Sequence, residues 1–203
     1  MKPIINGAVE HMIRPVYKYE GTVARLMGDG ILAFFGAPIA HEDDPSRAVM
    51  AGLEIVEGLA PYRGKIQEQW GLAIDVRVGI NTGLVVVGAV GSDLRMEYTA
   101  MGDAIHLAAR MEQTAAPGTV QIAHDTYRQV APLFDVEDLG GIEIKGKEDP
   151  VPAFRVLGQK TTAGRTRGID GLEAEMVGRV DEMGRLQDLL ANLERGIGRI
   201  VCL

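Results

Sequence analysis

TVARLMGDGILAFF, residues 22–35, is the most informative stretch of the chain, because two short apolar segments flank a glycine turn. The segments are Thr22–Met27 and Ile31–Phe35, and Gly28-Asp29-Gly30 separates them. Two strand-like segments joined by so short a glycine-containing loop predict a β-hairpin. Asp29 is expected at the tip of that hairpin.

Helical and strand-like patterns alternate along the chain on either side of the hairpin. Apolar residues recur at helical spacing over residues 4–19, where Pro15 predicts a kink or a local break. A second helix is expected from Pro45 towards Leu59, with Asp44 as its N-cap. This alternation predicts an α/β fold in which helices cover a sheet. The other expected elements are helices at 102–113 and 124–130 and strands at 73–80, 84–90 (buried on both faces), 120–123, 134–139 and 151–156.

The composition is that of an acidic globular protein, with 21 Lys and Arg against 28 Asp and Glu and a net charge of −7. A dedicated nucleic-acid binder needs a basic face, so no nucleic-acid partner is expected, although a local basic pocket for a small anion is compatible with this charge. The uncharged run at residues 31–40 is too short to span a bilayer, and the N-terminus lacks a signal-peptide layout. A cytoplasmic protein without membrane contact is therefore expected. The single cysteine, Cys202, excludes an internal disulfide.

A domain boundary is expected near Gly158. Residues 1–158 hold the alternating pattern, and residues 159–172 are rich in Gly, Thr and Arg, which is typical of a linker. Residues 173–203 begin a second region with a predicted helix at about 181–193.

Two acidic positions raise the question of a metal site. Asp29 lies between two glycines in a predicted tight turn. Such a carboxylate suits a hard cation, and the neighbouring backbone can approach phosphate groups there. An ordinary turn aspartate fits the local pattern as well. The run His41-Glu42-Asp43-Asp44-Pro45 is better explained as a helix start. Acids favour the positive end of a helix, and proline suits its first turn.

A second candidate cluster lies in residues 95–110. If residues 102–113 are helical, His106 and Arg110 are four apart and share a face. Together with Arg77 and Arg95, Arg110 would form a basic pocket on an acidic protein. Scattered surface arginines and a structural histidine are the competing interpretation, and the spacing alone leaves both open.

Four motifs, taken in order, carry a resemblance to a known family. MGDGILAFFG (27–36), RVGINTG (77–83), YTAMGD (98–103) and AARME (108–112) together resemble the class III adenylate/guanylate cyclase catalytic domain. Any one of them alone is a weak signal, but their order is specific, and the resemblance covers about residues 1–157. It implies a ferredoxin-like α/β (α+β) fold that works as a homodimer with its active sites at the interface.

The resemblance also implies a reaction. Two Mg²⁺ or Mn²⁺ ions, held by two aspartates, activate the 3′-hydroxyl of a nucleoside triphosphate, which attacks its own α-phosphorus and releases pyrophosphate and a cyclic nucleotide. ATP is the expected substrate, because Thr99 occupies the position that meets the exocyclic group of the base and threonine there is common in bacterial adenylate-type members. GTP stays open.

The family's site residues transfer unevenly to this sequence. Asp29 matches the second metal aspartate, and Arg110 matches the arginine that stabilises the transition state. Arg77 and Lys145 match positions that contact the triphosphate. Arg25 stands where a base-reading lysine is usual, and a guanidinium keeps the charge but not the compact geometry of lysine.

Two further departures affect the expected activity. His106 stands where an asparagine usually positions the ribose, and a histidine keeps a donor nitrogen but is bulkier. The family's first metal aspartate lies on a strand before the first helix, and no acid of this sequence matches it. The 203 residues alone are therefore expected to lack the first strand and to be inactive. The alternative is a degenerate cyclase-homology module that dimerises and regulates an attached ATPase.

The tail carries a second, shorter resemblance. Val177-Gly178-Arg179 with Glu182 resembles the entry into an ATPase domain of the AAA/STAND type, which is often fused behind such cyclases. No phosphate-binding loop motif follows it in this sequence.

Overall fold

The computed structural model divides into two compact units, residues 1–164 and 165–203. The predicted tail helix and the predicted linker lie almost entirely outside the described residues. Those described are 2–90, 97–101, 103–143, 149–160, 184–185 and 188–189.

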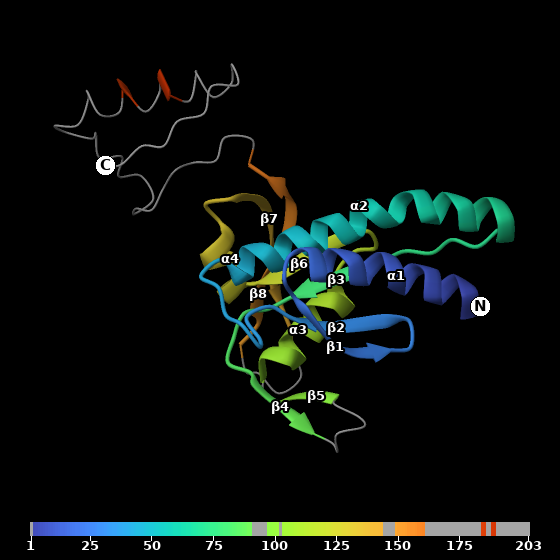
Figure 1. Cartoon of the computed structure of the whole chain (residues 1–203), viewed down its shortest axis with the longest axis horizontal. Helices are drawn as coiled ribbons and strands as arrows, with labels where there is room; N and C mark the ends of the chain where they lie inside the picture. Colours follow the sequence, from blue (N-terminus) through green and yellow to red (C-terminus); the bar gives the residue numbers. More distant parts are fainter. Residues whose placement is uncertain are drawn as a thin grey trace. The chain divides into compact units, whose positions relative to one another are not determined.

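Helices and strands alternate through the described part of the first unit (Figure 1), as the sequence predicts. No described helix is both long and apolar enough to cross a membrane. The elements are α1 (Lys2–Lys18), β1 (Thr22–Met27), β2 (Gly30–Phe34), α2 (Asp44–Trp70), β3 (Arg77–Ile80), β4 (Val86–Val90), β5 (Glu97–Met101), α3 (Asp103–Thr114), β6 (Thr119–Ala123), α4 (His124–Val130), β7 (Phe134–Ile142) and β8 (Val151–Gln159).

A four-stranded sheet in the order β3-β6-β8-β7 forms the centre of the unit. Strand β3 runs parallel to β6, and the other two pairings are antiparallel. Alternate residues of β6 serve opposite faces, as the pleat requires. Val120 and Ile122 pack with α2 and α4, whereas Ala123 packs with Leu107 and Met111 of α3. The sheet therefore carries α2 and α4 on one face and α3 on the other.

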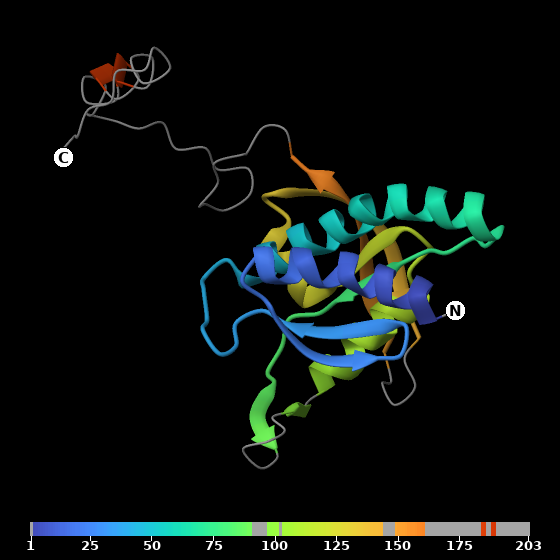
Figure 2. The same cartoon turned by 45° about the vertical axis from the view of Figure 1, so that its right-hand side comes forward.

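The predicted hairpin is confirmed. Strands β1 and β2 pair antiparallel, with Arg25 opposite Leu32 and Met27 opposite Gly30, and Gly28 takes the left-handed conformation (φ 72°) that the turn needs. Helix α1 runs beside α2 (Figures 1 and 2), and both pack on the hairpin through a second apolar cluster around Val16.

The break predicted as one possibility at Pro15 and the predicted end of the second helix near Leu59 are both wrong. Pro15 does not break α1, which runs unbroken to Lys18, and α2 continues past Pro61 to Trp70. Tertiary packing outweighs the local penalty in each case. In α1 the neighbouring Val16 is buried, and Ile66 is buried in the last part of α2.

The strand predictions are partly wrong between residues 71 and 101. Strand β3 begins only at Arg77, and β4 only at Val86. The run at 84–90 is not buried on both faces, because Leu84 is 95% exposed and Val86 73% exposed. Strand β4 pairs with β5, a strand that the sequence patterns did not predict. These two strands form a separate hairpin rather than part of the central sheet.

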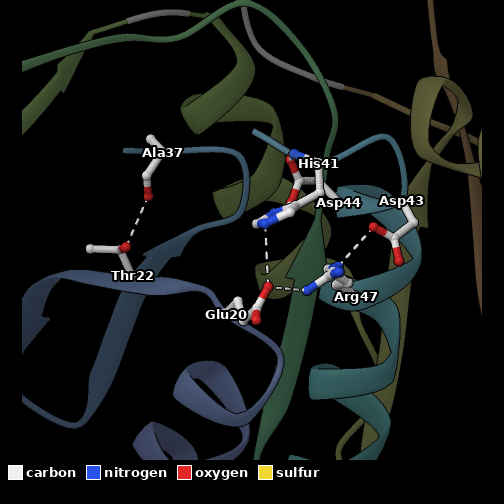
Figure 3. A network of polar contacts seen from close by, with 7 residues as sticks. All are labelled: Glu20, Thr22, Ala37, His41, Asp43, Asp44 and Arg47. Atoms are coloured by element: carbon white, nitrogen blue, oxygen red, sulfur yellow. Dashed lines mark hydrogen bonds and ion pairs between the residues drawn. The ribbon is translucent and has the colours of Figure 1, made fainter. Parts of the chain in front are cut away.

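A network of charged side chains marks the start of α2 (Figure 3). Asp44 is not the N-cap. It lies inside the helix, and its carboxylate accepts the backbone N–H of His41 at 2.7 Å. The His41 ring lies between Asp44 and Glu20, at 3.2 and 3.3 Å, and Arg47 donates to Glu20 and to Asp43. The network thus ties the end of α1 to the first turn of α2.

Candidate functional site

The tip of the β1–β2 hairpin presents Asp29 to solvent. A methyl group built on either neighbour, Gly28 or Gly30, would meet no atom within 4 Å, so the space around the turn is open. Asp29 has no hydrogen-bond or ion-pair partner among the described residues. Across those residues no three His, Cys, Asp or Glu side chains gather into a metal-binding group. Asp29 therefore offers one hard oxygen ligand but does not complete a metal site with the side chains described.

Arg25 and Thr99 come from neighbouring strands. Arg25 lies exposed on β1, four residues before Asp29, and β1 contacts β5, which carries Thr99. Within the β4–β5 hairpin Thr99 pairs with Gly88. The two strands that carry the positions assigned to the base by the sequence resemblance are therefore in contact. The structure describes the backbone of Thr99 but not its side chain.

Helix α3 carries His106 and Arg110 one turn apart. Its buried side, Leu107 and Met111, fixes the helix on the sheet, and His106 is exposed on another side. Arg110 is half-buried, and its Nη1 donates to Oε1 of Gln113 at 3.0 Å. The guanidinium therefore lies along its own helix, with the rest of its donors available to a ligand.

Arg77 lies apart from these two residues. It begins β3, is exposed, and pairs in register with Thr119. Two residues later, Gly79 lies against the backbone of Ala108 and Glu112 in α3. Because α3 and β3 run in opposite directions, Arg77 lies toward the C-terminal end of α3, away from His106. Arg95 and Lys145 lie outside the described residues. The described residues therefore do not show the predicted basic pocket.

Asn81 is a further residue of this region, and the sequence patterns did not single it out. Asn81 donates from Nδ2 to the backbone oxygen of Ala104, in the first turn of α3, at 3.1 Å. Its position in the RVGINTG motif, two residues after Gly79 on the same side of the chain, was the signal that could have identified it.

Comparison with known proteins identifies a family and several relatives of this chain. Residues 4–158 match the family model described as the adenylate and guanylate cyclase catalytic domain. Adenylate cyclase 1 of Rhizobium meliloti (strain 1021) is 30% identical over 145 residues, which are 70% of this chain and 22% of that protein. The chain thus spans about a fifth of the length of that curated relative.

Two solved structures share the fold. The adenylyl cyclase CyaB from P. aeruginosa has a TM-score of 0.73 and 31% identity, over 79% of this chain and 83% of that chain. The guanylyl cyclase Cya2 has a TM-score of 0.71 and 30% identity, over 79% of this chain and 81% of that chain. The predicted mixed α/β fold class is therefore confirmed.

Proposed function

Since this chain belongs to the adenylate and guanylate cyclase catalytic domain family, we propose that, within the full-length protein, it converts ATP to 3′,5′-cyclic AMP and pyrophosphate in intracellular signal transduction. The observation that supports the proposal is the contact between β1, which carries Arg25, and β5, which carries Thr99. His106 and Arg110 supply the second pair of polar groups, on one helix. The proposed active site is shared between two copies of the chain.

ATP is the preferred substrate in this proposal because of Thr99. A hydroxyl can accept a hydrogen bond from the exocyclic amino group of adenine, and it donates as well. Arg25 brings a planar, permanently charged group to the same region. Relatives of both substrate types resemble this chain, so the choice of base depends on these two residues.

Asp29 would bind a divalent cation, Mg²⁺ or Mn²⁺, because carboxylate oxygen is the ligand that such hard ions prefer. When bound, the ions lower the pKa of the attacking hydroxyl and neutralise phosphate charge. One carboxylate does not hold Mg²⁺ well, because the ion keeps its waters unless several hard ligands converge. We therefore propose that residues 1–203 expressed alone are inactive.

Arg110 would neutralise charge on the transferring phosphorus, and its half-buried position favours that role, since charge interactions strengthen away from water. His106 would orient the ribose through a ring nitrogen. Arg77 and Lys145 would contact the triphosphate. Arg77 lies away from His106 within one copy, so in the dimer it would serve the site to which Asp29 contributes.

The second candidate function is a non-catalytic module that dimerises and regulates an attached ATPase. Arg25 and His106, which depart from the residues usual in the family, favour it. The attached ATPase in this proposal rests on the short resemblance at Val177-Gly178-Arg179.

The test is cyclic-AMP formation from ATP and Mn²⁺ by the natural full-length protein. We expect activity in the wild type, loss in Asp29→Ala, and unchanged activity in the control Asp135→Ala, which removes an exposed carboxylate from β7. An inactive wild-type protein that still dimerises would favour the regulatory module. Activity that survives Asp29→Ala would contradict the metal-binding role.

A further inference from the structure

We infer that Asn81 is a positioning residue, which fixes the first turn of α3 and through it the side chains of His106 and Arg110. The inference rests on the proposed function, because those two side chains have a reaction to perform only if the chain is a cyclase. Asn81 itself reaches no reacting group.

Three alternate residues of the RVGINTG motif face α3. A methyl group on Gly79 would lie 2.1 Å from the backbone N of Glu112, and one on Gly83 would lie 2.9 Å from Cβ of Ala104. Both glycines therefore let the backbone approach the helix closely. Asn81 stands between them and is the one residue of the three with a polar side chain.

Only one of the two polar atoms of the Asn81 side-chain amide has a hydrogen-bond partner among the described residues. Its Nδ2 donates to the oxygen of Ala104, whereas its Oδ1 is buried and has no hydrogen-bond partner among the described residues. A buried polar atom without a partner costs stability, and an apolar side chain of the same size would avoid that cost. A gain in stability therefore does not explain why an amide stands at position 81. Its hydrogen bond to α3 does explain it.

That hydrogen bond acts at the functional end of the helix. Ala104 precedes His106 by two residues and Arg110 by six, so a shift of the first turn moves His106 most and Arg110 less. The C-terminal end of α3 is held separately, where Gln121 Nε2 donates to Thr114 Oγ1 at 2.7 Å. Loss of the Asn81 bond is therefore expected to displace the first turn while the helix stays on the sheet.

Thr82 provides a matched control. It follows Asn81 directly, and its hydroxyl pairs with Thr126 Oγ1 of α4 at 3.0 Å. Helix α4 carries no residue of the proposed site. Thr82→Val therefore removes one side-chain hydrogen bond from the same loop without touching α3.

The experiment compares Asn81→Leu, Asn81→Ala and Thr82→Val in the natural full-length protein. We measure kcat and KM for ATP, thermal stability, and hydrogen exchange of the α3 amides. Asn81→Leu keeps the branched shape of the side chain, although leucine is larger, and removes the unpartnered oxygen. Asn81→Ala covers the case in which leucine does not fit. A misplaced active-site group costs about 10- to 100-fold in rate.

We expect both Asn81 variants to lose about that factor in kcat with KM little changed, and to exchange the amides of 106–110 faster, while Asn81→Leu keeps its melting temperature. Thr82→Val should keep its kcat and its α3 exchange. Wild-type kcat and wild-type α3 exchange in both Asn81 variants would overturn the inference. If the wild type forms no cyclic nucleotide, the proposed function fails, and the exchange comparison still decides whether Asn81 anchors α3.

Discussion

At the scale of single residues, close packing places stricter demands on the chain than charge does. Gly79 is the clearest example, because a side chain there would collide with the backbone of α3 and not with a flexible side chain that could move. The residue that sets the spacing between β3 and α3 thus also sets where Arg110 lies. Asn81 then fixes the end of the same helix.

Gly79→Ala tests that packing. The added methyl would lie 2.1 Å from Glu112 N and 2.4 Å from Ala108 O, so β3 and α3 must separate. We expect a loss of about 3 kcal/mol in the free energy of unfolding, measured by urea titration. The control Gly58→Ala, in α2 with no atom within 4 Å of the added methyl, should gain about 0.5 to 1 kcal/mol. Equal effects at the two positions would contradict the close-packing account.

Thr99→Ala tests the choice of base. If the hydroxyl meets the adenine amino group, its removal should lower the ratio of kcat/KM for ATP over GTP more than it lowers turnover with ATP. A matched change, Arg25→Lys, restores the residue usual in the family and should keep the preference for ATP. An unchanged ratio in Thr99→Ala would show that this position does not select the base.

At the scale of helices and strands, the sequence predicted the elements whose signal is local. The β1–β2 hairpin depends on its own turn, and the amphipathic pattern of α3 is contained within its twelve residues. The break considered at Pro15 and the length of α2 were predicted wrongly, because burial against other elements holds those helices together. Strand β5 was missed for a related reason, since its pairing with β4 is its main support.

The site was predictable to a similar degree. Asp29 lies at the tip of the predicted hairpin, and His106 and Arg110 lie on one helix, because these placements follow from local geometry. The contact of β1 with β5 and the hydrogen bond of Asn81 to Ala104 join segments far apart in sequence. No periodicity in the sequence reports such contacts.

Two ion pairs, Arg47–Asp43 and Lys18–Glu54, predict that the folded protein loses stability in acid. The hydrogen bond from Arg47 lowers the pKa of Asp43, and the hydrogen bond from Lys18 lowers the pKa of Glu54. A lowered carboxyl pKa adds stability above the ordinary carboxyl value, and that stability is lost as pH falls through the folded-state pKa. Both pairs are partly exposed to solvent, so the effect is modest and screened by salt.

We therefore expect the melting temperature to fall between about pH 5 and about pH 3 at low salt, and to fall less steeply in Arg47→Met. High salt should flatten both curves. A wild-type protein and an Arg47→Met variant with identical acid slopes would show that these pairs do not link folding to pH.

The β1–β2 hairpin and the central sheet are expected to differ in how well their backbone amides are protected from hydrogen exchange. Strands β1 and β2 pair only with each other in the described part of the chain, whereas β6 and β8 are inner strands with buried residues on both sides. Two-stranded units are only marginally stable on their own. We expect the amides of β1 and β2 to exchange with deuterium earlier than those of β6 and β8. Equal protection of the two groups would contradict this account.

At the scale of the whole molecule, the central claim is that the active site is shared between two copies. Within one copy Asp29 stands at the hairpin tip, and Arg110 lies on α3 against the sheet. If each proposed site takes Asp29 from one copy and Arg110 from the other, each single variant destroys both sites of its own homodimer. A mixed dimer of the two variants then contains one site with both changes and one intact site.

The most direct test is therefore complementation between Asp29→Ala and Arg110→Ala in the natural full-length protein. Each variant alone should form no cyclic AMP from ATP and Mn²⁺. Mixing equal amounts under conditions that allow subunit exchange should restore about a quarter of wild-type activity, because half of the dimers are mixed and each has one intact site. With an active wild type and confirmed exchange, a mixture that stays as inactive as its components would contradict the shared site.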